Sequence, residues 1–185
     1  MMTPEQVLHF WFAGDPATHR DEWFEKSTAF DASCRQFADA LQEAKSGAFD
    51  HWAEKPRGAL ALIILLDQFS RNLHRDSPVA FAADVKAREV AHAAIARKFD
   101  QALGPIERMF VYLPFMHSED RADQERSVQL FTPLGEETLR HATDHRDVIF
   151  QFGRFPHRNS ALGRTSTPEE LDYLARRDAG TSDAQ

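Results

Sequence analysis

The sequence predicts an all-α protein, and three observations support that prediction. Apolar residues recur at steps of three and four in most segments, which is the spacing of one helix face. No segment alternates apolar and polar residues in the way of a half-buried strand. Pro, Gly and capping residues divide the chain at short intervals. We therefore predict a single helical domain over residues 1–177, with about eight to nine helices packed as antiparallel pairs, and a mobile tail over 178–185.

Four helices are predicted in the first half of the chain. Thr3-Pro4-Glu5-Gln6 is a capping-box start for the first of them. A long amphipathic helix is expected from about Arg20 to Ser46, and Gly47 is its C-terminal stop. The segment 57–75 begins apolar on all sides, so this helix is expected to be enclosed by its neighbours. An Ala-rich helix is predicted over about 79–99.

The second half is predicted to hold four shorter helices and one long ordered loop. The helices are expected over 106–113, 118–131, 134–145 and 167–177, and the loop over 153–166. Pro114 is expected to stop or kink the first of these helices. Ser118 is expected to cap the second, with the adjacent acids in its positive first turn. A second capping box, Thr167-Pro168-Glu169-Glu170, begins the last helix.

Composition and charge narrow the classes of function and the compartment. The formal net charge of −7 opposes non-specific binding to phosphate backbones, so nucleic acid is not an expected partner. The single cysteine, Cys34, excludes an internal disulfide and falls at a core position of a helical pattern. The N-terminus lacks the pattern of a signal peptide, and the longest apolar run, 59–66, is too short to cross a membrane. We therefore expect a cytoplasmic protein without membrane contact.

The first polar motif lies in the helix that is otherwise predicted to be buried. Asp67, Arg71 and His74 share one helical face, directly after turns that are entirely apolar. A buried charge needs a partner, so Asp67 and Arg71 are interpreted as a structural ion pair. The alternative is that Arg71, Asn72 and His74 line a pocket for an anionic ligand.

The second polar motif surrounds Pro114. Arg108 and Tyr112 share a face before it, and His117, Glu119 and Asp120 crowd the start of the following helix. A histidine beside two acids could bind a metal ion or perform acid–base chemistry. The alternative is that the acids only cap the helix and complement its dipole.

The third polar motif is the ordered loop over 153–166. Arg154, His157, Arg158 and Arg164 supply four basic or potentially basic side chains, and Asn159 lies among them. Arginine forks and backbone amides before a helix suit a phosphate or a carboxylate. The alternative is a loop that its arginines pin to acidic helix surfaces.

Other chemical signals are weak. His141 and His145 are four residues apart on a predicted helix, but the intervening residues lack the glutamate of the zinc-protease motif. No Gly-rich phosphate loop, nucleophile elbow or cysteine pair occurs in the sequence. The sequence therefore identifies no cofactor and no metal ligand set.

Four motifs in the same order resemble a bacterial family, DUF924. They are Phe10-Trp11-Phe12 and the segments 66–72, 112–120 and 153–159. The resemblance extends from about residue 4 to residue 175. It implies a fold similar to tetratricopeptide-like helical arrays. It implies no established activity, so it supports the fold and leaves the function open.

Three functions of different classes follow as hypotheses, and whether the protein is an enzyme stays open. The first is a pocket for a small anionic ligand, with His117 and His157 as acid or base. Its ligand-binding residues would be Asp67, Arg71, Asn72, Arg108, Tyr112, Glu119, Arg154, Arg158 and Asn159. The second is an interaction module that holds a protein partner in a groove between helices. The third is a metal-dependent hydrolase that uses His117, Glu119 and Asp120, with His157 as a further candidate ligand.

Overall fold

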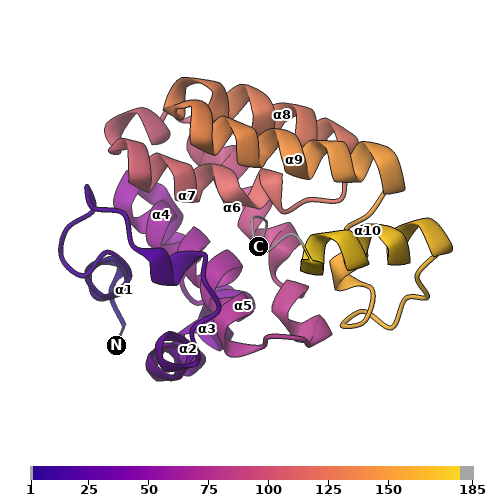
Figure 1. Ribbon diagram of the computed structural model, residues 1–185. Helices are drawn as coiled ribbons and strands as arrows, with labels where there is room; N and C mark the ends of the chain where they lie inside the picture. Colours follow the sequence, from indigo (N-terminus) through magenta and orange to yellow (C-terminus); the bar gives the residue numbers. More distant parts are fainter. Residues whose placement is uncertain (1, 180–185) are drawn as a thin grey trace. The chain divides into compact units, whose positions relative to one another are not determined.

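The described residues of the computed structural model, 2–179, are helical or lie in turns and loops between helices (Figure 1). No strand occurs among them, which confirms the all-α prediction. The helices are α1 (Pro4–Trp11), α2 (Thr28–Cys34), α3 (Ala38–Ser46), α4 (Pro56–Ile63), α5 (Ser70–Leu73), α6 (Asp84–Ala96), α7 (Pro105–Met116), α8 (Arg121–Phe131), α9 (Glu136–Phe152) and α10 (Pro168–Ala179). No helix in the described part of the chain is both long and apolar enough to span a membrane.

The chain divides into two compact units, which we describe separately. Unit 1 comprises the residues up to Arg75 and Val79–Pro114, and therefore includes α1 to α6 and most of α7. Unit 2 comprises Asp76–Pro78 and the residues from Phe115 onward, with α8, α9 and α10. The single-domain span of 1–177 and the tetratricopeptide-like arrangement stay predictions. Residues 180–185 of the predicted tail lie outside the described residues.

The centre of unit 1 is α4, which packs against α1 and α6. Its residues from Gly58 to Ile63 are buried, which confirms the prediction that neighbours enclose this helix. The helix does not end at Ile63 but continues as a π-helical segment, Ile64–Phe69, and then as α5. A π-helix is rare and is often found at functional sites. In this chain it carries Asp67, a charge that is almost completely buried.

An aromatic cluster forms a second part of the unit 1 core. Trp11 is its centre and contacts the rings of Trp23, Phe69 and Phe110, with ring centroids 6.2, 5.2 and 5.5 Å away. The indole N–H of Trp23 donates to the backbone carbonyl of Trp11 at 2.9 Å. Large rings bury much apolar area each, so this cluster supplies a substantial part of the core stabilisation.

In unit 2, α8 and α9 form a helical hairpin. The two helices lie side by side in Figure 1 and are joined by a short connection that ends at Gly135, whose φ is +119°. Their buried residues include Gln124, Ser127 and His145 as well as apolar side chains. Buried polar groups such as these need hydrogen-bond partners.

Several predicted element boundaries were wrong, among them the end of α9, which lies at Phe152 and not near residue 145. The helix expected over 20–46 is broken into a short 3-10 turn, α2 and α3, because Ser27 caps a new helix by accepting from the Phe30 N–H. Gly47 does end α3, with a φ of +94°. The cap of α8 is Asp120 and not Ser118, since its carboxylate accepts from two first-turn amides.

Pro114 does not stop α7, which runs on to Met116. A proline inside a helix removes one backbone hydrogen bond and normally ends or bends the helix. Here only two helical residues follow it, and the side chain of Gln124 donates to the backbone oxygens at the end of α7 and just beyond it. Its amide nitrogen lies 2.7 Å from the Met116 oxygen and 2.6 Å from the Ser118 oxygen.

Candidate functional site

The predicted site residues fall into two groups, one in each unit. Unit 1 holds Asp67, Arg71, Asn72, Arg108 and Tyr112. Unit 2 holds His117, Glu119, Arg154, His157, Arg158 and Asn159. Each group therefore has to be assessed by the partners that its own unit supplies.

Arg71 is the centre of the unit 1 group, and two carboxylates neutralise it. Its Nη1 lies 3.1 Å from Oδ1 of Asp67, one helical turn earlier, which confirms the predicted ion pair. The same guanidinium makes a two-point bond to Asp84 at 2.9 and 3.0 Å. Burial opposes the charge of Arg71, but Asp67 and Asp84 outweigh burial and raise its pKa.

The other polar residues of unit 1 also have intramolecular partners. The Asn72 amide donates to Asp31 at 2.8 Å, and Arg75 binds the same carboxylate through Nε and Nη2. The Tyr112 hydroxyl donates to Oδ2 of Asp100 at 2.6 Å. Arg108 donates to the backbone oxygens of Asp100 and Leu103, at 3.1 and 3.2 Å. These bonds join segments of unit 1 to one another and thus have a structural role.

In unit 2, Glu119 does not cap α8 as predicted but binds the loop that follows α9. Its carboxylate accepts from the Phe155 backbone N–H at 2.8 Å and from both terminal nitrogens of Arg164, at 2.8 and 2.9 Å. Burial alone would raise the pKa of Glu119. The bonds from Arg164 and Phe155 reverse that effect and lower it.

Glu170 is the second carboxylate that binds this loop. It accepts from Arg154 Nε and Nη2 at 2.6 and 2.8 Å, and from the Thr167 backbone N–H at 2.8 Å in the predicted capping box. The hydrogen bond from Arg154 is the main reason that the pKa of Glu170 falls to about 2.

Asn159 joins these two ion pairs into one network. Its side-chain oxygen accepts from Arg164 Nε at 2.9 Å, and its side-chain nitrogen donates to Glu170 at 3.1 Å. The loop is therefore held to Glu119 through Phe155 and Arg164, and to Glu170 through Arg154 and Asn159. This confirms the interpretation of a loop that its arginines pin to acidic side chains.

Next to this network lies a group of basic side chains around Phe155, which we call the basic cluster: His117, His145, His157 and Arg158. The Arg158 guanidinium stacks over the Phe155 ring, 4.5 Å from its centroid, and its Nη2 donates to the His117 backbone oxygen at 2.9 Å. The rings of His145 and His157 lie 5.6 and 5.4 Å from the Phe155 ring. Segments at residues 145 and 157 thus meet at one aromatic side chain, and Arg158 connects the segment at residue 117 to them.

Two imidazoles of the basic cluster are held neutral. Burial, followed by the positive potential of His117, lowers the pKa of His145 to about 3. Burial, followed by Arg177 and Arg158, lowers the pKa of His157 to about 2. Nδ1 of His145 also lies 2.8 Å from the His141 backbone oxygen, so in the neutral ring Nδ1 carries the proton and Nε2 is an acceptor.

Sequence reasoning dismissed His145 as a weak metal signal, and it missed Arg177 and the role of Glu170 as the partner of Arg154. His145 is one of the buried residues of α9. Glu170 was recognised only as part of a capping box. No group of three or more His, Cys, Asp or Glu side chains suited to a metal ion occurs in the described part of the chain.

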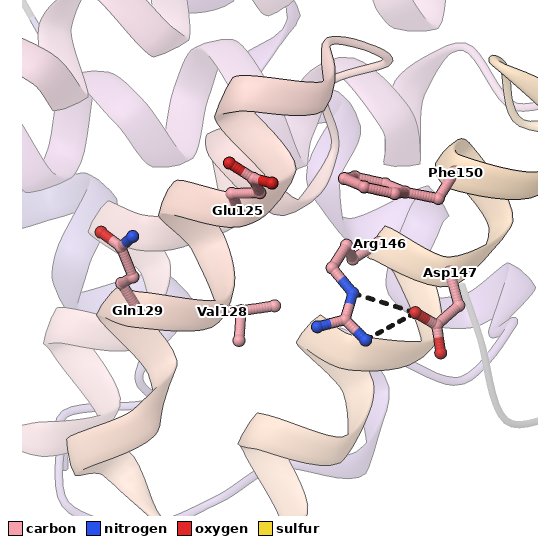
Figure 2. Close-up of a pocket in the computed structure, with 6 residues that line it drawn as sticks. All are labelled: Glu125, Val128, Gln129, Arg146, Asp147 and Phe150. Atoms are coloured by element: carbon pink, nitrogen blue, oxygen red, sulfur yellow. Dashed lines mark hydrogen bonds and ion pairs between the residues drawn. The ribbon is translucent and has the colours of Figure 1, made fainter.

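A separate hollow of about 420 Å³ lies between α8 and α9 (Figure 2). Glu125, Val128 and Gln129 line it from α8, and Arg146, Asp147 and Phe150 line it from α9. Arg146 binds Asp147 through Nε and Nη2 at 2.9 and 2.6 Å. None of these residues was among the predicted site residues.

Comparison with known proteins agrees with the resemblance that the motifs indicated. The model of the family described as bacterial protein of unknown function, DUF924, matches residues 7–178. Among solved structures, a protein of unknown function from Agrobacterium tumefaciens, ATU0120, is similar over 94% of this chain and 97% of its own. The TM-score is 0.88 and the sequence identity is 44%. Among curated proteins, none matches this chain.

Proposed function

We propose that this chain, which belongs to the DUF924 family, binds a small anion at the basic cluster of unit 2. The ligand would carry a phosphate or a carboxylate group. The observation that carries the proposal is the presence of two neutral histidines and a buried arginine around Phe155, in a positive local potential. A bound anion would offset that positive potential. It would also accept hydrogen bonds from N–H groups of the basic cluster.

The charge balance of the neighbouring network supports this choice of site. Three arginines, Arg154, Arg158 and Arg164, face two carboxylates, Glu119 and Glu170. The two carboxylates are already bonded to Arg154 and Arg164. The guanidinium of Arg158 lies next to the imidazoles, and its charge contributes to lowering the pKa of both His145 and His157.

Binding is a better supported function than acid–base catalysis. A histidine whose pKa is about 2 is neutral at physiological pH and cannot serve as a general acid there. Its imidazole nitrogens can still donate or accept hydrogen bonds. His157 is half-buried and so is the member of the cluster that a ligand can reach first. Among the described residues, no set of donors supports the alternative of a metal-dependent hydrolase.

The test is a histidine-detected NMR titration with inorganic phosphate and, separately, with succinate. We expect one of the two anions to shift the His145 and His157 ring signals and to raise the pKa of both rings. An Arg158→Gln variant should lose the shifts, whereas Arg140→Gln, an exposed arginine of α9, should keep them. If Arg158→Gln does not fold, a His157→Asn variant takes its place. The proposal is wrong if neither anion perturbs these rings in the wild-type chain.

A further inference from the structure

The last helix, α10, is held in unit 2 most firmly at its first turn. Glu170 is 2% exposed there, and its carboxylate accepts hydrogen bonds from Arg154 and Asn159. From Leu171 to Arg177, by contrast, no side chain is buried, and Leu171 is 56% exposed. A helical segment that buries so little side-chain surface opens locally at a low cost in free energy. The first turn can therefore stay bound while the rest of the helix moves.

One face of α10 lies against the segment that carries part of the basic cluster. The buried and half-buried residues of the helix recur at steps of three and four and are Glu170, Tyr173, Leu174 and Arg177. This face packs on the 3-10 turn Pro156–Arg158, which holds His157 and Arg158. The inner face of α10 therefore covers two members of the basic cluster.

Two side chains of this inner face lie near the cluster. The Tyr173 ring contacts the Phe152 ring at the end of α9, with centroids 5.2 Å apart. Arg177 is near enough to His157 for its charge to contribute, after burial, to the lowered pKa of that imidazole. A guanidinium in this position attracts an anion that binds beside His157.

The basic cluster is poorly accessible in this structure. His117, His145 and Arg158 are 8%, 6% and 7% exposed. An anion that binds them has to be admitted by the movement of a covering element. In unit 2, α10 both packs on the cluster and buries little beyond its first turn, so it is the element best suited to move.

We propose that α10 is a lid over the basic cluster and that Arg177 is a further residue that binds the anion, an inference that rests on the proposed function. The helix beyond Glu170 swings away from the turn Pro156–Arg158 to admit the anion. The bonds of Glu170 to Arg154 hold the first turn in place during this movement. When the lid closes, the guanidinium of Arg177 donates hydrogen bonds to the bound anion.

Modification of His157 by diethyl pyrocarbonate tests the lid in the full chain without any ligand. This reagent acylates neutral imidazoles that are open to solvent, and mass spectrometry measures the rate at each histidine. A short bismaleimide that joins Phe152→Cys to Tyr173→Cys, in a Cys34→Ala background, holds α10 against α9. We expect this cross-link to slow the modification of His157 about fivefold or more, because it prevents local opening. The exposed His51 should keep its rate, and the same variant without the reagent is the control.

Two further variants test the lid without a cross-link. Tyr173→Ala removes the ring contact with Phe152 and should speed the modification of His157. Leu171→Ala removes a large side chain from the outer face of the same helix and should leave the rate unchanged. Melting temperatures establish that both variants are folded.

A titration with phosphate and, separately, with succinate tests the role of Arg177 through the ring signals of His145 and His157. Arg177→Gln should weaken the binding of the anion about tenfold. Arg176→Gln removes the same charge from the neighbouring exposed position and should bind like the wild-type chain.

Two results would overturn this inference. If His157 is modified at the same rate with and without the cross-link, and in Tyr173→Ala as in Leu171→Ala, α10 is not a lid. If Arg177→Gln binds the anion as tightly as Arg176→Gln does, Arg177 is not a binding residue. Failure of the wild-type chain to bind either anion would instead contradict the proposed function, and the modification rates would still decide whether α10 opens.

Discussion

At the scale of single residues, burial and charge act together on two histidines of unit 2. His145 and His157 are neutral in the folded chain because their surroundings are apolar and their charged neighbours are basic. In the unfolded chain both rings would titrate near their ordinary pKa of 6.5. Folding therefore becomes less favourable when these rings take up protons in the unfolded state.

This difference predicts a pH dependence of stability. The pKa values of both rings are lower in the folded chain than in the unfolded chain. The contribution of the two neutral rings to the free energy of unfolding is therefore complete above about pH 6.5, and it is lost as the pH falls toward about 3. We expect urea denaturation to show a decreasing free energy of unfolding from neutral pH to about pH 5. A His145→Gln variant should show a smaller decrease, and His141→Gln, on the same helix, should resemble the wild-type chain. Equal slopes in all three proteins would contradict the prediction.

Local partners of charged residues could be predicted from the sequence, whereas distant ones could not. Asp67 and Arg71 are one helical turn apart, and this spacing was sufficient to predict their ion pair. Asp84, the second partner of Arg71, belongs to another helix. The pairs Arg164–Glu119 and Arg154–Glu170 likewise join segments whose proximity depends on the tertiary fold.

At the scale of elements, the buried helix α4 depends on one close approach. Gly58 lies against the 3-10 turn Asp50–Glu54, where a Cβ atom would be 2.2 Å from the Trp52 carbonyl oxygen. That turn is itself fixed by the stacking of Trp52 on Phe49, with centroids 4.2 Å apart. A backbone carbonyl cannot move aside as a flexible side chain can, so a glycine is required at this contact.

We predict that Gly58→Ala destabilises the protein, although alanine is the better helix former by about 1 kcal/mol. The clash should outweigh that gain and lower the free energy of unfolding by about 2 kcal/mol. Gly104→Ala is the matched control, because there a Cβ atom would meet Glu107 at an ordinary 3.6 Å. Urea denaturation of both variants measures the difference. A Gly58→Ala protein as stable as the wild type would show that the turn can move.

Helix starts were easier to predict than helix continuity. The capping box at Thr3 and the stop at Gly47 are set by local chemistry, and both were predicted. The break at Ser27 and the π-helical segment Ile64–Phe69 were not. Both keep the apolar pattern of an uninterrupted helix, so periodicity alone does not distinguish them from an α-helix.

At the scale of the whole molecule, the one thiol of the chain is enclosed in the core. Cys34 is fully buried, and burial together with the nearby Asp31 raises its pKa to about 12. The reactive form of a cysteine is the thiolate. In the folded chain, neither access nor ionisation favours the reaction of this thiol.

We therefore expect a thiol reagent such as Ellman's reagent to label the native chain only as fast as the structure around Cys34 opens. The same chain unfolded in urea should react at once and with one equivalent. Absorbance at a series of urea concentrations measures both rates. Immediate labelling of the native chain would mean that the core around α2 is open to solvent.

The aromatic cluster has a consequence for optical measurements. All three tryptophans of the chain, at positions 11, 23 and 52, belong to unit 1, whereas the basic cluster belongs to unit 2. Intrinsic emission excited at the indole band therefore originates in unit 1 and carries no direct signal from the basic cluster. A tryptophan introduced at Phe152, beside Tyr173, would give unit 2 a fluorophore of its own.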